Sequence, residues 1–354
     1  MRHLVYTRPG HVEWQEARDP ELADDTSVLV QPLAVSRCDL DLPMARDGLF
    51  PGPYPVGHEI AGRVVATGGR VRNHRAGDTV IVPFQLSCGR CGPCRRGTFA
   101  ACATYMAPVG GSFGFGSWGG GHGGGLADLL AVPDADHLLL AAPPGVPAVA
   151  LATLSDNVVD GYRAVGPALA ERPGAEVLIV AAAAGALALY TAAAAIALGA
   201  ARVRYVDRDP ARAEAARQLG ADSSHHGGPW PKRFDPAPVT VDVTGDAHGL
   251  ACVIRSTERY GVCTGLAIAF EAATPLPLLE MYTRGITFHT SRADARRYLP
   301  DVLRLLATTG FNPMAVPTTI RPWEEAPEAW LQPAVKLVVE RERLAAGTPS
   351  APAR

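Results

Sequence analysis

The sequence has no surplus of basic residues. Its 33 Lys and Arg residues nearly balance its 35 Asp and Glu residues, which leaves a formal net charge of -2. Proteins that bind polyanions carry a basic surplus or a basic patch. The near balance of charge therefore argues against nucleic acid as a partner.

Long apolar runs are also missing from the sequence. No apolar stretch approaches the roughly 20 residues that are needed to span a bilayer. The first residues, Met1 to Leu4, lack the apolar core of a signal peptide. We therefore expect a cytoplasmic protein that has no membrane partner.

Cysteine is scarce, with 7 residues among 354. In a reducing compartment such cysteines are more often metal ligands or core residues than disulfide partners. We expect Cys252 and Cys263, which lie in a predicted helix and strand, to be core residues. The spacing of the others points to a different role.

Four cysteines form the run C-x2-C-x2-C-x7-C: Cys88, Cys91, Cys94 and Cys102. Gly and Pro bend the backbone between them, so that four thiolates can converge tetrahedrally on one Zn2+. Such a site is structural, because four protein ligands leave no coordination position for a substrate. An iron–sulfur cluster is the chemical alternative.

The chain divides into a strand-rich part and a part in which strands and helices alternate. Its length suits two domains rather than one. Short strands with Gly and Pro between them are predicted at 27–35, 60–67 and 79–83. Further along, strands are predicted at 176–182, 202–206, 239–243 and 261–265, and helices at 186–198, 210–219 and 248–260. This alternation predicts βαβ units and a parallel sheet.

Upstream of the cysteine run, the sequence matches the motif G-H-E-x2-G-x5-G-x2-V at every fixed position: Gly57, His58, Glu59, Gly62, Gly68 and Val71. Together with the cysteine run, this motif makes the chain resemble the zinc-containing alcohol dehydrogenases of the medium-chain dehydrogenase/reductase superfamily. The resemblance extends from about residue 28 to residue 339.

The resemblance implies an α/β fold in two domains. A β-rich, GroES-like catalytic domain would comprise residues 1–157 and 293–354. A Rossmann domain with a doubly wound parallel sheet would comprise residues 158–292. The resemblance also implies two zinc ions per chain, a small alcohol or carbonyl substrate, and assembly into a homodimer or homotetramer.

For the catalytic zinc, the resemblance implies three ligands, Cys38, His58 and Asp156, and one open position. Many relatives have Cys in the third place, whereas the glutathione-independent formaldehyde dehydrogenases have Asp. A helix N-cap is the alternative role for Asp156. Asp41 is expected to hold the imidazole of His58 in one tautomer. Glu59 lies near the metal, either as a transient ligand or as a hydrogen-bonding partner of the ligands.

The expected cofactor turn departs from the dinucleotide motif G-x-G-x-x-G. Its glycine positions fall at Ala183, Gly185 and Ala188, so only the middle glycine remains. Alanine at a position that requires a positive φ would add strain of about 1 kcal/mol. Asp207 follows about 20 residues later, where a carboxylate binds the adenosine ribose and favours NAD over NADP, with an ordinary Asp at a strand end as the alternative. Lys336 lies where relatives carry a pyrophosphate contact, although it could equally be a solvated lysine.

The family's proton relay is absent. The relay uses a Ser or Thr two residues after the first zinc ligand and a His three residues further on, and these positions hold Leu40 and Pro43. The proton must therefore take another route, through Asp160, Glu59, His122 or water. Asp160 is our candidate base, because it lies four residues beyond the third ligand and would share its helix face. A solvated or capping carboxylate is the alternative.

The function that we infer is an NAD-dependent oxidoreductase, in which zinc polarises an alcohol or carbonyl and a hydride passes to or from nicotinamide. A non-redox lyase, hydratase or isomerase on the same zinc is the alternative, motivated by the missing relay and the altered turn. A metal-stabilised binding protein is a third possibility, against which the complete ligand set counts. The glycine-rich stretch 110–125 is either a flexible loop or a loop that shapes the substrate entrance.

Overall fold

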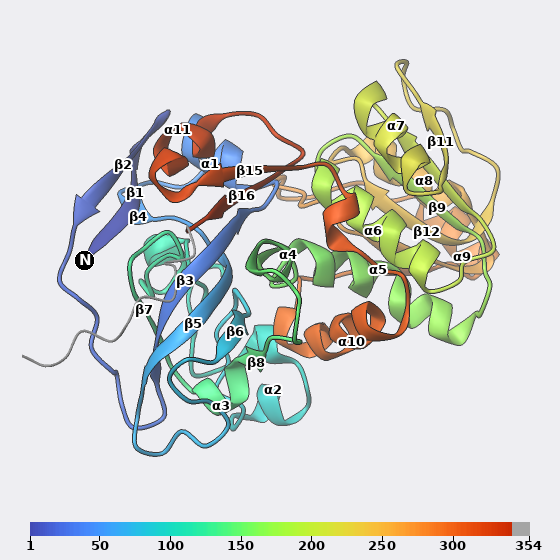
Figure 1. Ribbon diagram of the computed structural model, residues 1–354. Helices are drawn as coiled ribbons and strands as arrows, with labels where there is room; N and C mark the ends of the chain where they lie inside the picture. Colours follow the sequence, from blue (N-terminus) through green and yellow to red (C-terminus); the bar gives the residue numbers. More distant parts are fainter. Residues whose placement is uncertain (342–354) are drawn as a thin grey trace, which may run out of the picture.

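The computed structural model describes residues 1–341 and shows two lobes, one rich in antiparallel strands and one built on a parallel sheet (Figure 1). The strands of the first lobe come from residues 2–141 and 318–340, and those of the second from residues 177–290. Within the described residues, no helix combines the length and apolarity that a membrane crossing requires.

A seven-stranded sheet forms the core of the strand-rich lobe, with β3 (Val28–Arg37) and β5 (Glu59–Thr67) at its centre. The sheet is completed by β6 (Thr79–Val82), β7 (Leu130–Val132), β8 (Leu140–Ala141), β15 (Thr318–Pro322) and β16 (Lys336–Glu340). A smaller sheet beside it contains β1 (Arg2–Arg8), β2 (His11–Glu16) and β4 (Tyr54–Pro55). The three strands predicted in this part of the sequence are confirmed.

The pairing of β16 with β3 brings the end of the described chain to its beginning. The two strands run antiparallel, with Leu337 opposite Arg37. On the other side of β3, Ser36 lies opposite Glu59 of β5. This arrangement places the first residue of β16, Lys336, near the end of β3 and the start of β5, where the expected zinc ligands lie.

Six parallel strands form the sheet of the second lobe, in the order β11-β10-β9-β12-β13-β14. This is the doubly wound order of dinucleotide-binding folds. The strands are β9 (Val177–Ala181), β10 (Val203–Asp207), β11 (Asp222–His225), β12 (Ala237–Val243), β13 (Thr257–Gly265) and β14 (Thr287–Thr290). Every residue of β9 is buried, as expected for a parallel strand that is covered on both faces. The predicted fold class is confirmed.

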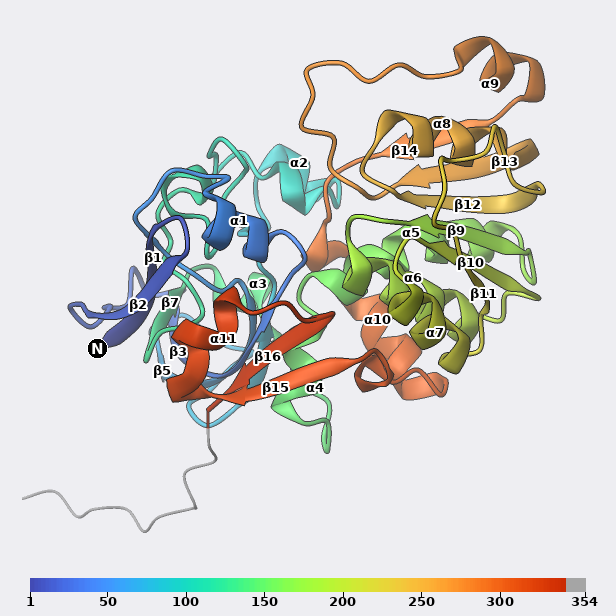
Figure 2. The ribbon, with the colours of Figure 1, turned by 90° about the horizontal axis from the view of Figure 1, so that it is seen from above.

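Helices cover both faces of the parallel sheet (Figure 2). Alternate β9 residues Val177 and Ile179 face a core shared with α5 (Asn157–Glu171), α6 (Gly185–Ala197) and α7 (Pro210–Gln218). Leu178 and Val180 face the other core, shared with α8 (Ala247–Arg255) and α9 (Leu278–Arg284). This alternation follows from the two-residue period of side chains along a strand.

The helix predicted at 248–260 ends earlier than expected, and the prediction was wrong for its last residues. Helix α8 stops at Arg255, and β13 begins at Thr257, which pairs with Ala237 of β12. At the boundary, the Ser256 hydroxyl donates to the carbonyl of Cys252 at 2.7 Å. The β-branched Thr257 favours the strand that follows.

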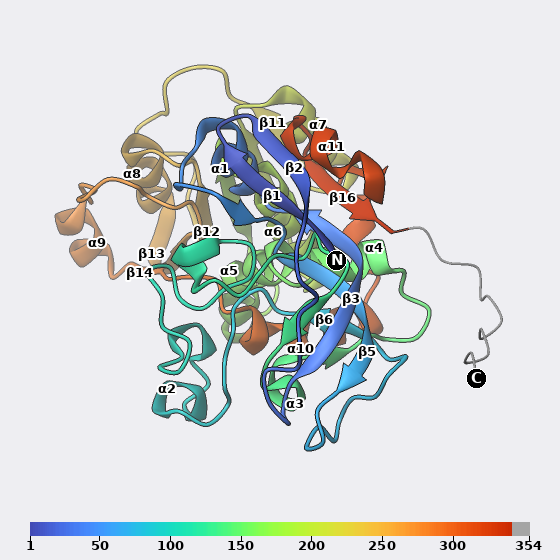
Figure 3. The same ribbon diagram turned by 90° about the vertical axis from the view of Figure 1, so that its left-hand side faces the viewer.

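The remaining helices are short, apart from α10 (Ala295–Thr308), which packs against α5. They are α1 (Asp41–Asp47), α2 (Gly92–Arg95), α3 (Ala135–Leu138), α4 (Ala148–Thr153), α11 (Ala326–Leu331) and four 3-10 turns, η1 (Phe99–Ala101), η2 (Gly116–Gly119), η3 (Pro313–Ala315) and η4 (Trp323–Glu325). Helix α4 packs against β3, β5 and β16, and so delivers the residues that follow it to the sheet ends. The segment around α2 projects from the lower edge of the strand-rich lobe (Figure 3).

Candidate metal centres and cofactor site

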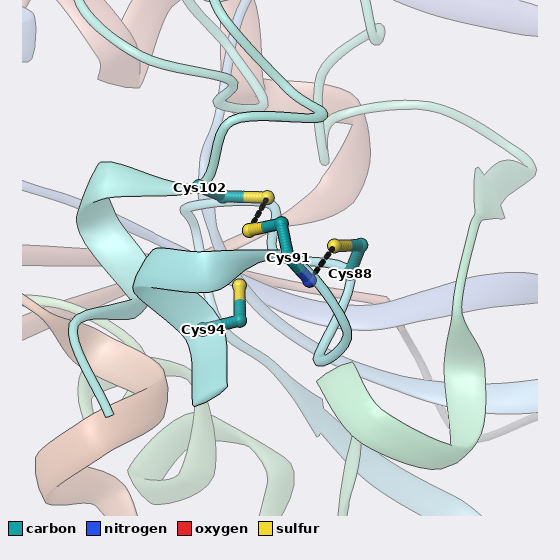
Figure 4. A group of neighbouring side chains, drawn as sticks. All are labelled: Cys88, Cys91, Cys94 and Cys102. Carbon is teal, nitrogen blue, oxygen red and sulfur yellow. Dashed lines mark hydrogen bonds between the residues drawn. The ribbon is translucent and has the colours of Figure 1, made fainter. Parts of the chain in front are cut away.

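The four clustered cysteines point toward one another around the short helix α2 (Figure 4). Their sulfur atoms all lie within 4.8 Å of one another, and Cys91 Sγ is 3.8 Å from Cys102 Sγ. Two corners of a tetrahedral site with Zn–S bonds of about 2.3 Å lie about 3.8 Å apart. All seven cysteines, which belong to the described residues, are free thiols. The cluster therefore fits a zinc ion as it stands.

Hydrogen-bond donors around the cluster favour the thiolate form. The Thr104 hydroxyl donates to Cys88 Sγ at 3.1 Å, and the amide of Ala103 donates to Cys91 Sγ at 3.4 Å. The amide of Cys94 lowers the pKa of the Cys91 thiol to about 6. Burial acts in the opposite direction and raises the pKa of Cys94 to about 12. A cation among the four sulfurs would offset that penalty.

Residues 85–104 carry the four cysteines and are called the cysteine lobe below. They are hydrogen-bonded to the residues at the start of α10. The amide of Phe99 donates to Asp294 Oδ2 at 3.0 Å. The Gln85 side chain donates to the carbonyl of Ala293 at 2.6 Å and accepts from the amide of Ala295 at 3.1 Å. The lobe thus joins segments that are about 200 residues apart in the chain. Metal binding to the four cysteines would therefore stabilise the contacts between these two distant segments of the sequence.

A second group of buried potential ligands lies at the adjoining ends of β3 and β5. Cys38, His58, Glu59 and Asp156 each offer one ligand atom, and these atoms lie within 4.8 Å of one another. His58 Nε2 is 3.2 Å from Asp156 Oδ2. Nitrogen and oxygen ligands of a tetrahedral zinc lie about 3.4 Å apart. The three expected ligands, with Glu59 beside them, therefore fit a metal ion.

Asp156 occupies the N-cap position of α5, yet its side chain faces His58. Within the described part of the chain, this side chain makes no capping hydrogen bond. The Ser155 hydroxyl fixes the preceding turn, because it accepts from the amide of Ile60 at 3.0 Å and donates to the carbonyl of Ala152 at 2.8 Å. The geometry favours a ligand role for Asp156 over a capping role. No sequence pattern identified the contribution of Ser155.

Asp41 lies on the far side of His58 from the metal position. Its Oδ2 accepts from the amide of Cys38 at 2.9 Å, and its Oδ1 is 3.3 Å from His58 Nδ1. Burial opposes protonation of His58, but Asp41, Cys38 and Asp156 outweigh it and raise the His58 pKa well above its usual value. Burial also raises the pKa of Cys38 to about 12. The site thus gathers groups that a bound cation, in place of a proton, would stabilise.

The sequence predicted that Lys336 would lie at a phosphate position, but in the structure Lys336 contacts Glu59. Its ammonium donates to both carboxylate oxygens of Glu59, at 2.8 and 2.6 Å, and to Asn157 Oδ1 at 2.8 Å. Both charged side chains are fully buried. Burial raises the pKa of Glu59 to about 7, while Lys336 opposes the increase. The pairing of β16 with β3 is the physical reason for this placement, because it buries Lys336 beside β5.

Asp160 is buried one turn along α5 and forms an ion pair. Arg163 Nε donates to Asp160 Oδ1 at 2.6 Å, and Arg163 Nη1 donates to Ser291 Oγ at 2.8 Å. Burial raises the pKa of Asp160, and Arg163 opposes this increase. The sequence interpretation missed Arg163, although its spacing of three residues from Asp160 on a helix was a usable signal.

His122, another expected proton carrier, lies in a different environment. Its ring packs edge-on against Tyr105, with the ring centroids 5.7 Å apart. It lines a cavity of about 460 Å³ together with residues of the N-terminal segment, among them Met1 and His3. None of the expected catalytic zinc ligands is among the described residues that line this cavity.

The glycine-rich stretch 110–125 is packed against the candidate zinc site. A Cβ on Gly114 would lie 2.9 Å from the carbonyl oxygen of Gly57 and 3.1 Å from His58 Cβ. Gly57 has a φ of +98°, and a Cβ there would lie 2.8 Å from Val35 Cγ1. Gly114 and Gly57 are therefore explained by the close approach of neighbouring atoms to the backbone, rather than by a need for flexibility.

Aromatic side chains surround His58 on the side of this stretch. The His58 ring centroid is 4.9 Å from that of Phe115 and 5.4 Å from that of Phe84. Phe50 packs against both Phe115 and Trp118. The sequence interpretation did not identify this cluster, because its members are scattered along the strand-rich lobe.

At the expected cofactor turn, the strain predicted for alanine is absent. Among the described residues, only Asp134 and Tyr260 combine a side chain with a positive φ, so Ala183 and Ala188 adopt ordinary backbone conformations. The methyl group of Ala183 is accommodated by Gly245, where a Cβ would approach it to 2.8 Å.

The N-terminus of α6 carries an acidic side chain from the other lobe. Asp39 Oδ1 accepts from the amide of Ala186 at 3.2 Å, and Asp39 Oδ2 accepts from the amide of Leu187 at 3.0 Å. Burial raises the pKa of Asp39, while these amides oppose the increase. Amides at this position of a doubly wound fold hold the pyrophosphate of a dinucleotide. In this structure, the two amides donate to the carboxylate of Asp39 instead. The sequence interpretation did not predict this contact.

Asp207, the expected ribose anchor, is fully buried and paired with Arg212. Arg212 Nη2 donates to Asp207 Oδ1 at 2.7 Å, and Arg212 Nε donates to Asp207 Oδ2 at 3.0 Å. The Tyr205 hydroxyl also donates to Oδ2, at 2.7 Å. Asp207 thus ends β10 as expected, but it is bonded within the protein rather than exposed to a ligand.

Comparison with known proteins agrees with the fold. The family model described as the alcohol dehydrogenase GroES-like domain matches residues 24–143. A probable zinc-binding alcohol dehydrogenase of Mycobacterium tuberculosis is 29% identical over 340 residues, which are 93% of this chain and 84% of that protein. A glutathione-independent formaldehyde dehydrogenase of Pseudomonas aeruginosa is 36% identical over 231 residues, covering 62% of this chain and 57% of that protein.

A solved structure extends the similarity to the whole fold. The alcohol dehydrogenase TADH from Thermus sp. ATN1 has a TM-score of 0.88 and 26% identity, and the match covers 97% of this chain and 100% of that one. A GroES-like domain joined to a doubly wound sheet defines the class of medium-chain dehydrogenases/reductases. The chain thus contains an alcohol dehydrogenase GroES-like domain, and it is similar in sequence and fold to zinc-containing alcohol dehydrogenases.

Proposed function

We propose that this chain uses a zinc ion held by Cys38, His58 and Asp156 to interconvert an alcohol and a carbonyl compound. A nicotinamide cofactor, when bound, takes up or supplies the hydride. The observation that carries the proposal is the buried convergence of three ligand atoms from three separate segments. Three protein ligands leave a zinc position for a substrate oxygen, which is the arrangement of catalytic zinc sites.

Lys336 helps to keep that position open. Its ammonium binds both carboxylate oxygens of Glu59, which would otherwise be free to complete the coordination. Cys38 and Asp156 supply two negative charges and His58 supplies a neutral nitrogen, so the metal would keep its Lewis acidity. Asp41 orients His58 from behind.

Asp160 is the group that we propose as the base for the substrate proton. Leu40 and Pro43 cannot transfer a proton, and Glu59 is engaged by Lys336. Arg163 favours the charged form of Asp160, which is the form that accepts a proton. Burial, by contrast, raises its pKa toward the range in which a base is effective.

The aromatic cluster beside His58 favours an apolar substituent on the substrate. Phe84 and Phe115 flank the imidazole, and Trp118 extends the cluster through Phe50. We therefore propose aryl or alkyl alcohols and aldehydes as the substrate class, in preference to polyols. Activity toward benzyl alcohol and toward a polyol such as glycerol compares the two classes directly.

Cys38→Ser tests the zinc assignment and the function together. We expect metal analysis to find close to two zinc ions per wild-type chain and about one in the variant, with alcohol oxidation lost. Cys263→Ala serves as the control, because Cys263 is a buried thiol in the parallel sheet and belongs to neither ligand group. A wild-type content of one zinc that Cys38→Ser leaves unchanged would contradict the assignment.

A further inference from the structure

The amides at the start of α6 already have an acceptor, and that acceptor is negatively charged. Helix α6 has 13 residues and begins at Gly185, the surviving glycine of the turn. Its second and third amides, those of Ala186 and Leu187, both donate to Asp39. The carboxylate therefore occupies the positive end of the helix dipole, where an anion is most strongly stabilised. A bound pyrophosphate would need the same two donors.

A second side chain, Arg212 of α7, covers the turn from within the parallel-sheet lobe. Arg212 Nη2 donates to the carbonyl of Ala182 at 3.0 Å, while the same guanidinium binds Asp207. Its Cδ lies so close to the turn that a Cβ on Gly185 would approach it to 2.4 Å. The space that a glycine opens at this turn is thus filled by Arg212.

We propose that Asp39 holds the pyrophosphate position of the dinucleotide site, so that a cofactor binds only when it displaces this carboxylate. The inference rests on the proposed function, since it names what controls cofactor binding at the same site. Asp39 is the affinity-determining residue of the turn.

Charge and geometry both support this role. Two acceptors cannot share the same pair of amide hydrogens, and a carboxylate at contact distance repels a diphosphate in a buried site. Asp39 directly follows Cys38, a candidate zinc ligand, and the amide of Leu40 donates to Cys38 Sγ at 3.3 Å. The backbone on both sides of Asp39 is therefore held, and its side chain must rotate away when a dinucleotide enters.

ADP-ribose is the probe for this inference, because it contains the pyrophosphate and the adenosine ribose but no nicotinamide. Its affinity is measured by isothermal titration calorimetry for wild type, Asp39→Asn and Asp39→Gly, all zinc-loaded. We expect Asp39→Gly to bind at least tenfold more tightly than wild type, and Asp39→Asn to show an intermediate gain because it loses the charge but keeps an acceptor. Asp47→Asn, an exposed carboxylate at the end of α1, is the control and should leave the affinity unchanged.

Hydrogen exchange gives a second measurement that needs neither ligand nor activity. In wild type, the amides of Ala186 and Leu187 are protected by Asp39, so Asp39→Gly should accelerate exchange in the peptide that covers the start of α6. Addition of ADP-ribose should restore protection in the variant. Zinc content and melting temperature of each variant show whether the neighbouring ligand Cys38 is disturbed.

The outcomes separate this inference from the proposed function. Equal ADP-ribose affinity in wild type and Asp39→Gly, with unchanged exchange at α6, overturns the role of Asp39 and leaves the oxidoreductase proposal intact. Tighter ADP-ribose binding in the variants, without hydride transfer by any form of the protein, supports Asp39 and overturns the oxidoreductase proposal. Absence of ADP-ribose binding in all forms at millimolar concentration overturns both and favours non-redox zinc chemistry.

Discussion

Asp160 and Arg163 form an ion pair in which two opposing influences act on one carboxylate. Burial raises the pKa of Asp160 and Arg163 opposes the increase. If Asp160 accepts the substrate proton, the rate of alcohol oxidation must fall as the pH decreases through its raised pKa, because the protonated acid is no longer a base. Arg163→Met should shift this acidic limb to higher pH, because the group that favours the charged form is gone.

Asp160→Asn removes the base but keeps the shape of the side chain. We expect the zinc-dependent rate to decrease roughly 100-fold and the acidic limb to disappear, as measured by steady-state kinetics between pH 5 and 9. Asp301→Asn, a carboxylate on α10 that pairs with Arg304, is the matched control. An Asp160→Asn enzyme with the wild-type rate and pH profile would leave water as the proton route.

We predict that the choice between NAD and NADP depends on Asp207, although Arg212 pairs with this carboxylate in the structure. A carboxylate at the end of β10 can accept from a ribose hydroxyl but repels a 2'-phosphate. We expect wild type to bind NADH more tightly than NADPH, and Asp207→Ala to narrow the difference, because Arg212 then has no acidic partner there. Fluorescence titration of both reduced cofactors measures the ratio, and equal wild-type affinities would refute the preference.

At the scale of elements, the turn between β4 and β5 depends on Gly57. Gly57 and Gly77 have nearly the same backbone angle, with φ of +98° and +97°, but only Gly57 has close neighbours. Gly77→Ala should therefore cost only the backbone strain, about 1–2 kcal/mol. Gly57→Ala should cost a further 1–3 kcal/mol, roughly, because its Cβ meets Val35.

Urea unfolding of the two variants checks this difference in free energy. A Gly57→Ala protein that is no less stable than Gly77→Ala would show that the turn relaxes freely. Loss of zinc from Gly57→Ala alone would extend the argument to function, because His58 is the next residue and Gly114 packs against its Cβ.

At the scale of the whole molecule, the cysteine lobe links distant parts of the chain. Phe99 and Gln85 bind the segment 293–295, which leads into α10. Cys94→Ser should remove one zinc ion and lower the melting temperature, because a structural zinc contributes its binding free energy to folding. Arg95→Ser, an exposed neighbour on α2, should change neither quantity.

Thermal melts and metal analysis of the two variants distinguish a structural from an incidental role for the lobe. Wild-type stability and zinc content in Cys94→Ser would show that the four cysteines do not hold a metal. A protein that retains its catalytic zinc but melts at lower temperature is the expected result.

Local patterns were sufficient to predict much of this protein. The cysteine run converges because its members are only a few residues apart, and the strands and helices of the parallel sheet follow from the alternation of apolar segments. The same local logic failed at residues 257–260, where pairing with β12 prevailed over the continued helix. The ligand roles of Cys38, His58 and Asp156 came from the family resemblance and stay predictions, although the fold brings these residues together.

Contacts between distant segments were decided only when the chain folded. Lys336 binds Glu59 because β16 pairs with β3, and Asp39 reaches α6 because the two lobes pack against each other. The spacing of residues in the sequence predicts neither the Lys336–Glu59 contact nor the contact of Asp39 with α6. A charged residue by itself indicates only that it needs a counter-charge or water. The identity of that counter-charge depends on which surfaces the tertiary structure buries together. At the start of α6, the tertiary structure placed Asp39 against the two amides of the cofactor turn, so that the turn is occupied rather than open.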